Sequence, residues 1–140
     1  MDRLSVELHN RTESFFYTII IAMFMRWMLH AKIHRATVTQ TRVDYEGSIT
    51  VDETLLKASG ILQGEKVLIA DVENGARFET YVMVGEKDTG IIALNGAAAH
   101  LCSVGDRIII MGFELTDEAI KAKVVHVDTS NKITEQFYYE

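Results

Sequence analysis

The stretch Asp44-Tyr45-Glu46-Gly47-Ser48-Ile49-Thr50 lies between two segments rich in β-forming residues, and the chain is organised around it. A Gly-Ser dipeptide between two such runs is typical of a tight connection between strands. The same dipeptide also places a hydroxyl directly after a flexible glycine, where it can reach the preceding carbonyl carbon. The local pattern alone favours the turn, so the rest of the chain has to decide whether Ser48 has a chemical role.

Size and composition restrict the class of protein. The chain has 140 residues, of which 48% are hydrophobic and 24% charged, as expected for one folded domain with a core. The net charge of −6 argues against a nucleic-acid partner, because phosphate neutralisation needs a basic face. The one cysteine, Cys102, cannot form an internal disulfide. We expect a cytoplasmic protein in which Cys102 is a small buried apolar residue.

Residues 1–27 differ from the rest of the chain. The run 15–25 (FFYTIIIAMFM) is apolar but about half as long as the roughly 20 residues of a membrane span. No small-residue signal-peptide cleavage site follows it, so we predict no membrane partner. Two interpretations stay open: a packed or amphipathic helix, or a segment that is not made because translation starts at Met25 or Met28. The predicted domain covers residues 28–140.

Short β-rich runs separated by turn signals predict six or seven strands. The clearest signal is the hairpin Glu73-Asn74-Gly75, which joins a buried strand to its returning partner. The predicted strands are residues 32–39, 42–50, 66–72, 77–84, 91–94, 107–113 and 123–127. So many short strands with few helices indicate a closed or nearly closed β-barrel.

Two or three short helices complete the prediction. Asp52 is a plausible N-cap of a helix over residues 52–58, and Gly60 lies beyond its end. Residues 95–100 start a second helix, and residues 116–119 make one helical turn. The tail 137–140 frays or packs on a neighbour.

Four blocks of sequence, in order, resemble the pyruvoyl-dependent aspartate decarboxylases, which make β-alanine for pantothenate synthesis. The blocks are Lys32-Ile33-His34-Arg35, Tyr45 to Thr50 (YEGSIT), Asn74 to Tyr81 (NGARFETY) and Asn95 to His100 (NGAAAH). The resemblance covers about residues 28–131. It implies a mainly β fold, the double-psi β-barrel, and a homotetramer with its sites between subunits. It also implies self-cleavage at Gly47–Ser48, which divides the zymogen into residues 1–47 and 48–140.

Self-cleavage has a chemical rationale in these residues. The Ser48 hydroxyl attacks the Gly47 carbonyl and converts the amide into an ester, which a strained turn at Gly47 would favour. By resemblance, Thr80 polarises that carbonyl. Loss of the Ser48 α-proton then leaves dehydroalanine, and hydrolysis gives a pyruvoyl group. The cofactor is therefore made from the chain, with no metal and no pyridoxal phosphate.

The resemblance also assigns the substrate site. The pyruvoyl group would form a Schiff base with L-aspartate and withdraw electrons as carbon dioxide leaves. Tyr81 is the implied proton donor, and Arg77 and Lys32 are the implied partners of the substrate carboxylates. The other implied residues are Asn95, Gly96, Ala97 and Ala98 along the substrate pocket, and Tyr45 and His34 near the cleavage site. Each also has an ordinary structural interpretation, and Asn95 is a natural helix N-cap.

One geometric conflict is visible in the sequence. On a regular strand Arg77 and Tyr81 share a face about 13 Å apart, and Thr80 faces the other way. Either a bulge bends the strand, or the site lies between subunits and uses both faces. The family's intersubunit site fits the second explanation, so we expect one chain alone to hold an incomplete site.

Other classes of protein fit the sequence less well. The five residues His9, His30, His34, His100 and Cys102 lack zinc-type spacing, and the nucleophile motif Gly-x-Ser-x-Gly is absent. The alternative from another class is a non-catalytic barrel that binds a ligand or partner and is never cleaved. Two questions stay open: whether cleavage needs a maturation partner, and whether anything besides resemblance favours aspartate over glutamate.

Overall fold

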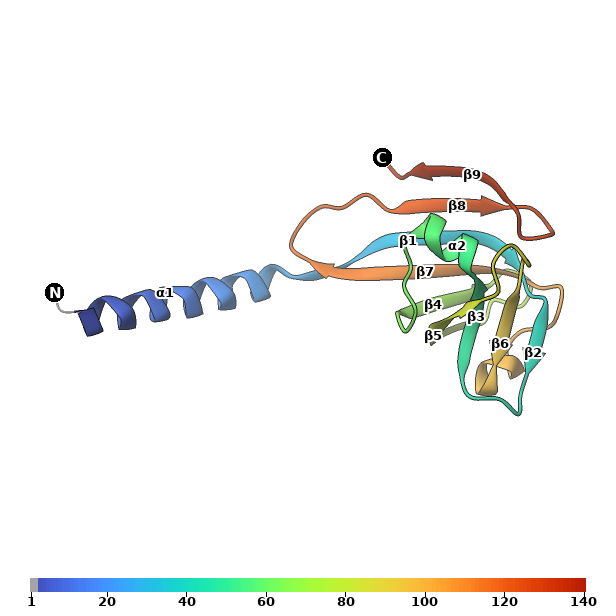
Figure 1. Ribbon diagram of the computed structural model, residues 1–140, viewed down its shortest axis with the longest axis horizontal. Helices are drawn as coiled ribbons and strands as arrows, with labels where there is room; N and C mark the ends of the chain where they lie inside the picture. The colour runs from blue at the N-terminus through green and yellow to red at the C-terminus, as the bar shows by residue number, and fades with distance from the viewer. Residues whose placement is uncertain (1–2) are drawn as a thin grey trace. The chain divides into compact units, whose positions relative to one another are not determined.

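A computed structural model describes residues 3–140 of the chain (Figure 1). The chain forms two compact units, which we describe separately. The smaller unit holds the described residues up to Met28 together with Glu114–Ala119, and the larger one holds Leu29–Phe113 and Ile120–Glu140.

The smaller unit is dominated by one helix, α1 (Arg3–Phe24). Its apolar second half is open to solvent, since Phe15, Phe16 and Met23 are 65%, 58% and 75% exposed. Among the described residues, no helix has the length and apolar character that a membrane crossing requires. The helical interpretation of residues 1–27 is therefore confirmed for 3–24, but its packing is not. Whether translation starts further along the chain stays a prediction.

Nine strands and two short helices follow α1. The strands are β1 (Arg26–Thr37), β2 (Gln40–Arg42), β3 (Ser48–Asp52), β4 (Lys66–Asp71), β5 (Arg77–Gly85), β6 (Ile92–Asn95), β7 (Arg107–Thr116), β8 (Lys123–Val127) and β9 (Ile133–Tyr138), and the helices are α2 (Glu53–Ser59) and η1 (Gly96–His100). The strands form one sheet in the order β2-β6-β3-β5-β4-β7-β1-β8-β9. The prediction of a mainly β fold with short helices is confirmed.

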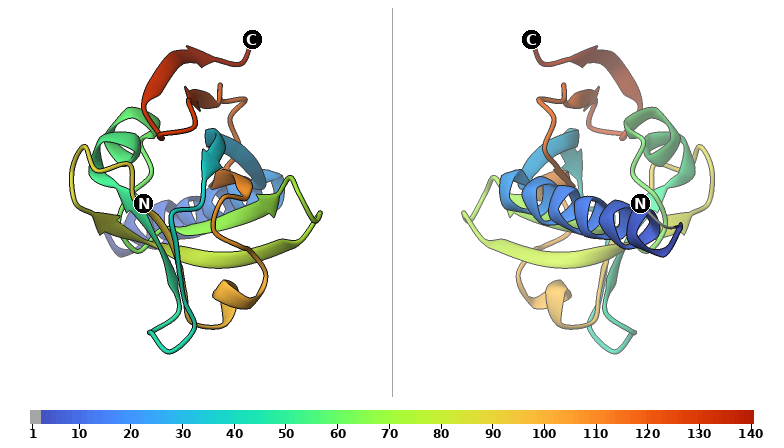
Figure 2. Two further views of the ribbon diagram at one scale, coloured as in Figure 1. Left: turned by 90° about the vertical axis from the view of Figure 1, so that its right-hand side faces the viewer. Right: turned by 90° about the vertical axis from the view of Figure 1, so that its left-hand side faces the viewer.

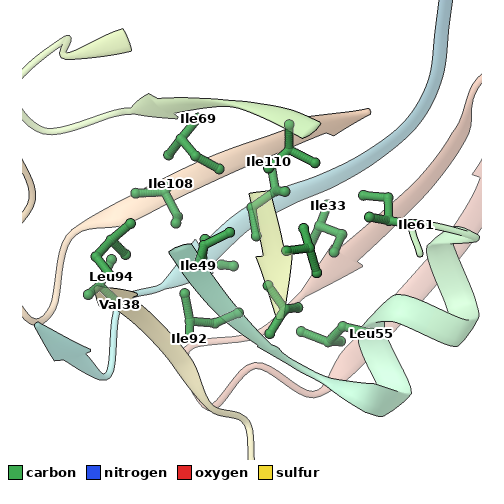
Figure 3. Close-up of a cluster of buried hydrophobic side chains, with 14 of the residues drawn as sticks. Ile33, Val38, Ile49, Leu55, Ile61, Ile69, Ile92, Leu94, Ile108 and Ile110 are labelled. Atoms are coloured by element: carbon green, nitrogen blue, oxygen red, sulfur yellow. The ribbon is translucent and has the colours of Figure 1, made fainter. Parts of the chain in front are cut away.

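The core of the larger unit is almost entirely aliphatic. On β7 alternate residues such as Ile108 and Ile110 point inward, because the side-chain period of a strand is two. Figure 3 shows isoleucine and leucine side chains from several strands and α2 converging on one interior. Eight large side chains there are at most 1% exposed: Ile33, Ile49, Leu55, Ile69, Ile92, Leu94, Ile108 and Ile110. This burial is the main source of stability for the larger unit.

The strands mix parallel and antiparallel neighbours. β1 with β8, β2 with β6, and β3 with β5 are parallel pairs. β3 with β6, β4 with β5, β4 with β7, and β8 with β9 are antiparallel. β3 therefore has an antiparallel partner on one side and a parallel partner on the other, an arrangement that positions the residues discussed below.

Local signals predicted two connections correctly. Asp52 caps α2 by accepting a hydrogen bond from the Thr54 amide at 2.8 Å, and Gly60 ends the helix with a left-handed φ of 81°. The β4–β5 hairpin turns at Gly75, whose φ is 75°.

Three predictions about elements were wrong. Residues 42–50 are not one strand, because β2 and β3 lie on opposite sides of β6 and the chain has to turn between them. Residues 116–119 make no helical turn: the Thr116 hydroxyl accepts a hydrogen bond from the Glu118 amide, and the chain only bends. The tail residues 137–138 belong to β9, which gains a full antiparallel partner in β8.

Asp52 links α2 to a distant loop. Its carboxylate is 2% exposed and accepts hydrogen bonds from the amides of Thr54, Asp88 and Gly90 at 2.8, 3.0 and 2.8 Å. Asp52→Ala leaves three amides without their acceptor, so we expect a loss of about 2–4 kcal/mol in the free energy of unfolding. Denaturant unfolding measures the loss. Glu86→Ala, which changes an exposed loop residue, is the matched control, and equal effects would contradict this role of Asp52.

Candidate active site

Ser48 is the first residue of β3 and is buried where the strand begins. It is 2% exposed, while Glu46 and Gly47 before it are exposed. Its antiparallel partner across the sheet is Asn95, the last residue of β6, which is fully buried. The Asn95 side-chain amide donates a hydrogen bond to the Ser48 hydroxyl at 2.9 Å. The strand pairing therefore fixes both the backbone and the hydroxyl of Ser48.

The same amide contacts a second hydroxyl. Asn95 Nδ2 also donates to Thr50 Oγ1 at 3.0 Å, because Thr50 lies two residues along β3 and faces the same side as Ser48. Within residues 3–140, Asn95 Oδ1 is buried and has no hydrogen-bond partner. Asn95 does precede η1 as predicted, but its side chain makes no capping bond. The side-chain amide donates its hydrogen bonds to the hydroxyls of Ser48 and Thr50 instead.

Gly96 lets η1 approach the Gly47 backbone closely. Gly96 is buried with a φ of 67°, and a Cβ atom there would lie 2.8 Å from the Gly47 Cα and 3.0 Å from the Tyr45 carbonyl oxygen. In Figure 1 the β2–β3 turn and η1 lie at the same end of the sheet. The expected strain at Gly47 is not seen, since its φ is not positive and a Cβ would meet nothing within 4 Å. The close packing requires a glycine at position 96 instead.

β5 brings Thr80 and Tyr81 to the other side of Ser48. Val82 is the parallel partner of Ile49, so the residues just before Val82 lie at the level of Ser48. Thr80 is half-buried and shares its face of β5 with the buried Val82, and Tyr81 is 42% exposed on the other face. Within the described chain no hydrogen bond joins Thr80 to Gly47. The structure therefore brings Thr80 to the strand next to the predicted cleavage position, and its role stays a prediction.

Arg77 lies at the start of β5, on the same outer face as Tyr81. The pairing with β4 is regular from Ala70 opposite Arg77 to Lys66 opposite Tyr81, so no bulge bends this part of the strand. Arg77 is exposed and about 13 Å along the strand from Tyr81. The explanation that a bulge bends the strand is therefore wrong. Thr80 lies on the half-buried face of β5, and Arg77 and Tyr81 lie on its exposed face.

Lys32 and His34 belong to a separate group on β1. Lys32 donates a hydrogen bond to the Tyr139 hydroxyl at 3.1 Å. The His34 ring lies 5.1 Å from that of His126, its partner on β8. Burial, followed by the neighbouring charges of Lys32, His126 and Arg35, lowers the pKa of His34. The contacts of Lys32 with Tyr139 and of His34 with His126 thus lie on the β8–β9 side of β1 and not at Ser48.

The remaining predicted site residues lie around η1 and the β2–β3 turn. Ala97 is exposed, and Ala98 is half-buried and packs against the core. The Tyr45 ring is 58% exposed and lies 5.7 Å from the Arg42 guanidinium. The Tyr45 carbonyl oxygen lies close to Gly96, where a Cβ atom would be 3.0 Å from it.

The metal-ligating side chains and the one cysteine lie as follows. No cluster of three metal-ligating side chains occurs in the part of the chain that the structure describes. Cys102 is buried, and burial together with the neighbouring Asp71 raises its thiol pKa to about 12. A thiol with that pKa is inert at neutral pH, which agrees with the predicted role as a buried apolar residue.

Two contacts at these sites escaped the sequence analysis. Thr50 had a detectable signal, because a residue two positions after Ser48 on a strand shares its face. Tyr139 had none, since its contact with Lys32 joins positions 107 residues apart.

The chain is similar to known decarboxylases. A family model described as aspartate decarboxylase matches residues 23–134. A protein named aspartate 1-decarboxylase from Lactiplantibacillus plantarum is 59% identical over 117 residues, which cover 81% of this chain and 90% of that protein. A protein of the same name from Corynebacterium efficiens is 52% identical over 113 residues, covering 78% and 83%.

A designed protein, mkDPBB_sym_86, is also similar in structure. Its TM-score is 0.45 at 16% identity, covering 58% of this chain and 95% of the design. This likeness is too distant to carry an argument about the fold, which rests on the strand pairings described above.

Replacing Gly96 tests the close packing of η1 on the β2–β3 turn. Gly96→Ala adds a methyl group against the Gly47 backbone at a positive φ, so we expect a loss of about 2–4 kcal/mol in the free energy of unfolding. Gly105→Ala is the matched control, since Gly105 has a φ of 95° but open space around its Cα. Denaturant unfolding compares the two. Equal losses would show that the φ alone matters and that the contact with Gly47 does not.

Proposed function

This chain belongs to the aspartate decarboxylase family, and we propose that it converts L-aspartate into β-alanine and carbon dioxide after cutting its own backbone at Gly47–Ser48. Relatives named aspartate 1-decarboxylase at 52–59% identity support the activity. The observation that carries the proposal is the position of Ser48. Its hydroxyl is buried, held by Asn95, and attached to an exposed Gly47.

The first reaction uses the groups at the turn. The Ser48 Oγ attacks the Gly47 carbonyl carbon, the peptide C–N bond breaks, and an ester links the two residues. Negative charge develops on the Gly47 oxygen, and Thr80 is the proposed donor to it. Asn95 restricts the hydroxyl to the face of β3 that it shares with Thr50. The approach of η1, which Gly96 permits, restricts the Gly47 backbone.

The site suits a pyruvoyl group at position 48. That group supplies an electron-withdrawing carbonyl, which a substrate amine can join and which stabilises charge as carbon dioxide leaves. The Asn95 side chain supports this assignment, because its buried NH₂ group is directed at residue 48 and can donate to a carbonyl formed there.

Three residues with exposed side chains or surface contacts are the proposed groups that bind and protonate the substrate. Tyr81 lies at the level of Ser48 and is the proposed proton donor. Arg77 offers a planar fork of donors to one carboxylate. Lys32 is the proposed partner of the second carboxylate, and Ala97 and Ala98 line the site with Gly96. L-Aspartate as the preferred substrate rests on the named relatives.

A second copy of the chain would complete this site. Arg77 and Tyr81 lie on the exposed face of β5, and Lys32 contacts Tyr139 on another part of the surface. Met83 continues the face of β5 as an exposed apolar side chain, 39% exposed. Such a surface suits a protein contact. We infer the homotetramer predicted from the sequence, with its sites between subunits.

The cytoplasmic location and the need for a maturation factor stay predictions.

The mass of the purified chain tests self-cleavage. We expect denaturing mass spectrometry to show two fragments, 1–47 and 48–140, with the second blocked at its amino end. Ser48→Ala removes the nucleophile, so it should keep the fold, leave one intact chain and release no carbon dioxide from aspartate. One intact mass for the wild type after long incubation would favour a non-catalytic binding barrel, and normal activity of Ser48→Ala would end the proposal.

Arg77→Lys tests the carboxylate contact separately from cleavage. Lysine keeps the charge but loses the two parallel hydrogen bonds, so we expect the KM for aspartate to rise about tenfold while cleavage continues. Steady-state kinetics on fully cleaved protein measure the change. Lys87→Arg, on an exposed loop, is the charge-conserving control. An unchanged KM would show that Arg77 does not bind the substrate.

A further inference from the structure

One side chain connects the two hydroxyls of β3. The Asn95 NH₂ group has two hydrogens, and one goes to Ser48 Oγ at 2.9 Å while the other goes to Thr50 Oγ1 at 3.0 Å. All of its donors are therefore used, and its oxygen has no partner within residues 3–140. The orientation of the amide depends on these two hydrogen bonds.

The proposed cleavage removes one of the two. After the ester forms, the Ser48 α-proton is lost, the Cβ–Oγ bond breaks, and Oγ leaves as an oxygen of the Gly47 carboxylate. Water then adds to the α-carbon of residue 48 and ammonia leaves, which gives the carbonyl. Asn95 thus loses the acceptor that oriented it in the uncut chain. A freely rotating amide could then present its oxygen where its NH₂ had been.

Two features of Thr50 hold its hydroxyl in position to accept a hydrogen bond from Asn95. As a β-branched residue it has a stiff χ1 angle. Its methyl group packs against the backbone at Gly85, where a Cβ atom would lie 2.9 Å from Thr50 Cγ2. With the methyl group fixed on the β5 side, the hydroxyl remains directed at Asn95 on β6.

We propose that Thr50 is a positioning residue, which keeps the Asn95 amide directed at residue 48 after the Ser48 hydroxyl has been consumed. The inference rests on the proposed function. It gives the two hydroxyls separate tasks: Ser48 orients the amide in the uncut chain, and Thr50 orients it in the mature enzyme. The amide hydrogen released by Ser48 then points at the position where the substrate amine reacts.

Thr50→Val tests this role, because valine keeps the shape and removes the hydroxyl. We expect the uncut Thr50→Val chain to cleave at a rate within about twofold of wild type, since Ser48 still accepts the amide hydrogen. The mature variant should lose about three- to tenfold in kcat, the range expected for one hydrogen bond. Reductive trapping of aspartate, read as a mass increase of fragment 48–140, should slow in parallel.

Thr50→Ser is the matched control, because it restores the hydroxyl without the methyl group. It should recover part of the lost kcat and trapping rate, which a purely structural effect of valine would not predict, and less than threonine gives, because serine lacks the methyl group that fixes the hydroxyl. Equal kcat in wild type and Thr50→Val overturns the inference, and so does a cleavage defect as large as the loss of kcat. Failure of serine to rescue also overturns it. An uncleaved wild-type chain, in contrast, overturns the proposed function itself.

Discussion

The pairing of Ser48 with Asn95 is the constraint on which the rest of the site depends. Antiparallel pairing of β3 with β6 sets the two residues opposite each other, and burial of both removes water as a competing partner. The hydroxyl is therefore oriented by the fold before any chemistry begins. On the other side of β3, the parallel pairing with β5 brings Thr80 and Tyr81 to the same level. One strand between two partners of opposite direction thus gathers residues that are distant in sequence. Figure 2 shows the ribbon from two further directions.

The same sheet order explains why the chain is exposed just before Ser48. β2 and β3 lie on either side of β6, so the segment between them has to leave the sheet and return. Gly47 is on the exposed part of that path, and Ser48 is the first residue to re-enter the sheet. In the proposed self-cleavage, such a boundary would combine a restrained Ser48 hydroxyl with an exposed Gly47. Gly96 contributes by allowing η1 to contact this segment. The close packing therefore requires a glycine at position 96 and not at position 47.

Local sequence signals predicted the elements whose ends carry their own turn chemistry. Asp52 and Gly60 mark α2, and Asn74-Gly75 marks the β4–β5 hairpin, because caps and left-handed glycines act within a few residues. The Gly47–Ser48 pattern favoured a turn, but one strand was predicted across residues 42–50, because the position of β6 between β2 and β3 is not visible in the sequence. β9 was missed since its strand depends on β8. The site shows the same division. Resemblance indicated Ser48 and Asn95, and the spacing of two residues along a strand places Thr50 on the face of Ser48. The hydrogen bonds of both hydroxyls to Asn95 arise from pairing across the sheet, which no local spacing encodes.

The exposure of Arg77 indicates what the single chain lacks. A guanidinium in water binds a carboxylate weakly, because the high dielectric constant screens the attraction and hydration competes with it. Ser48 and Asn95 are already withdrawn from water within one chain, but the outer face of β5 is not. A neighbouring subunit that covers this face would lower the local dielectric constant around Arg77 and Tyr81 and would strengthen both the ion pair and the proton transfer. In the proposed assembly, therefore, the barrel prepares the reactive residue, and subunit association prepares the surface that recognises the substrate.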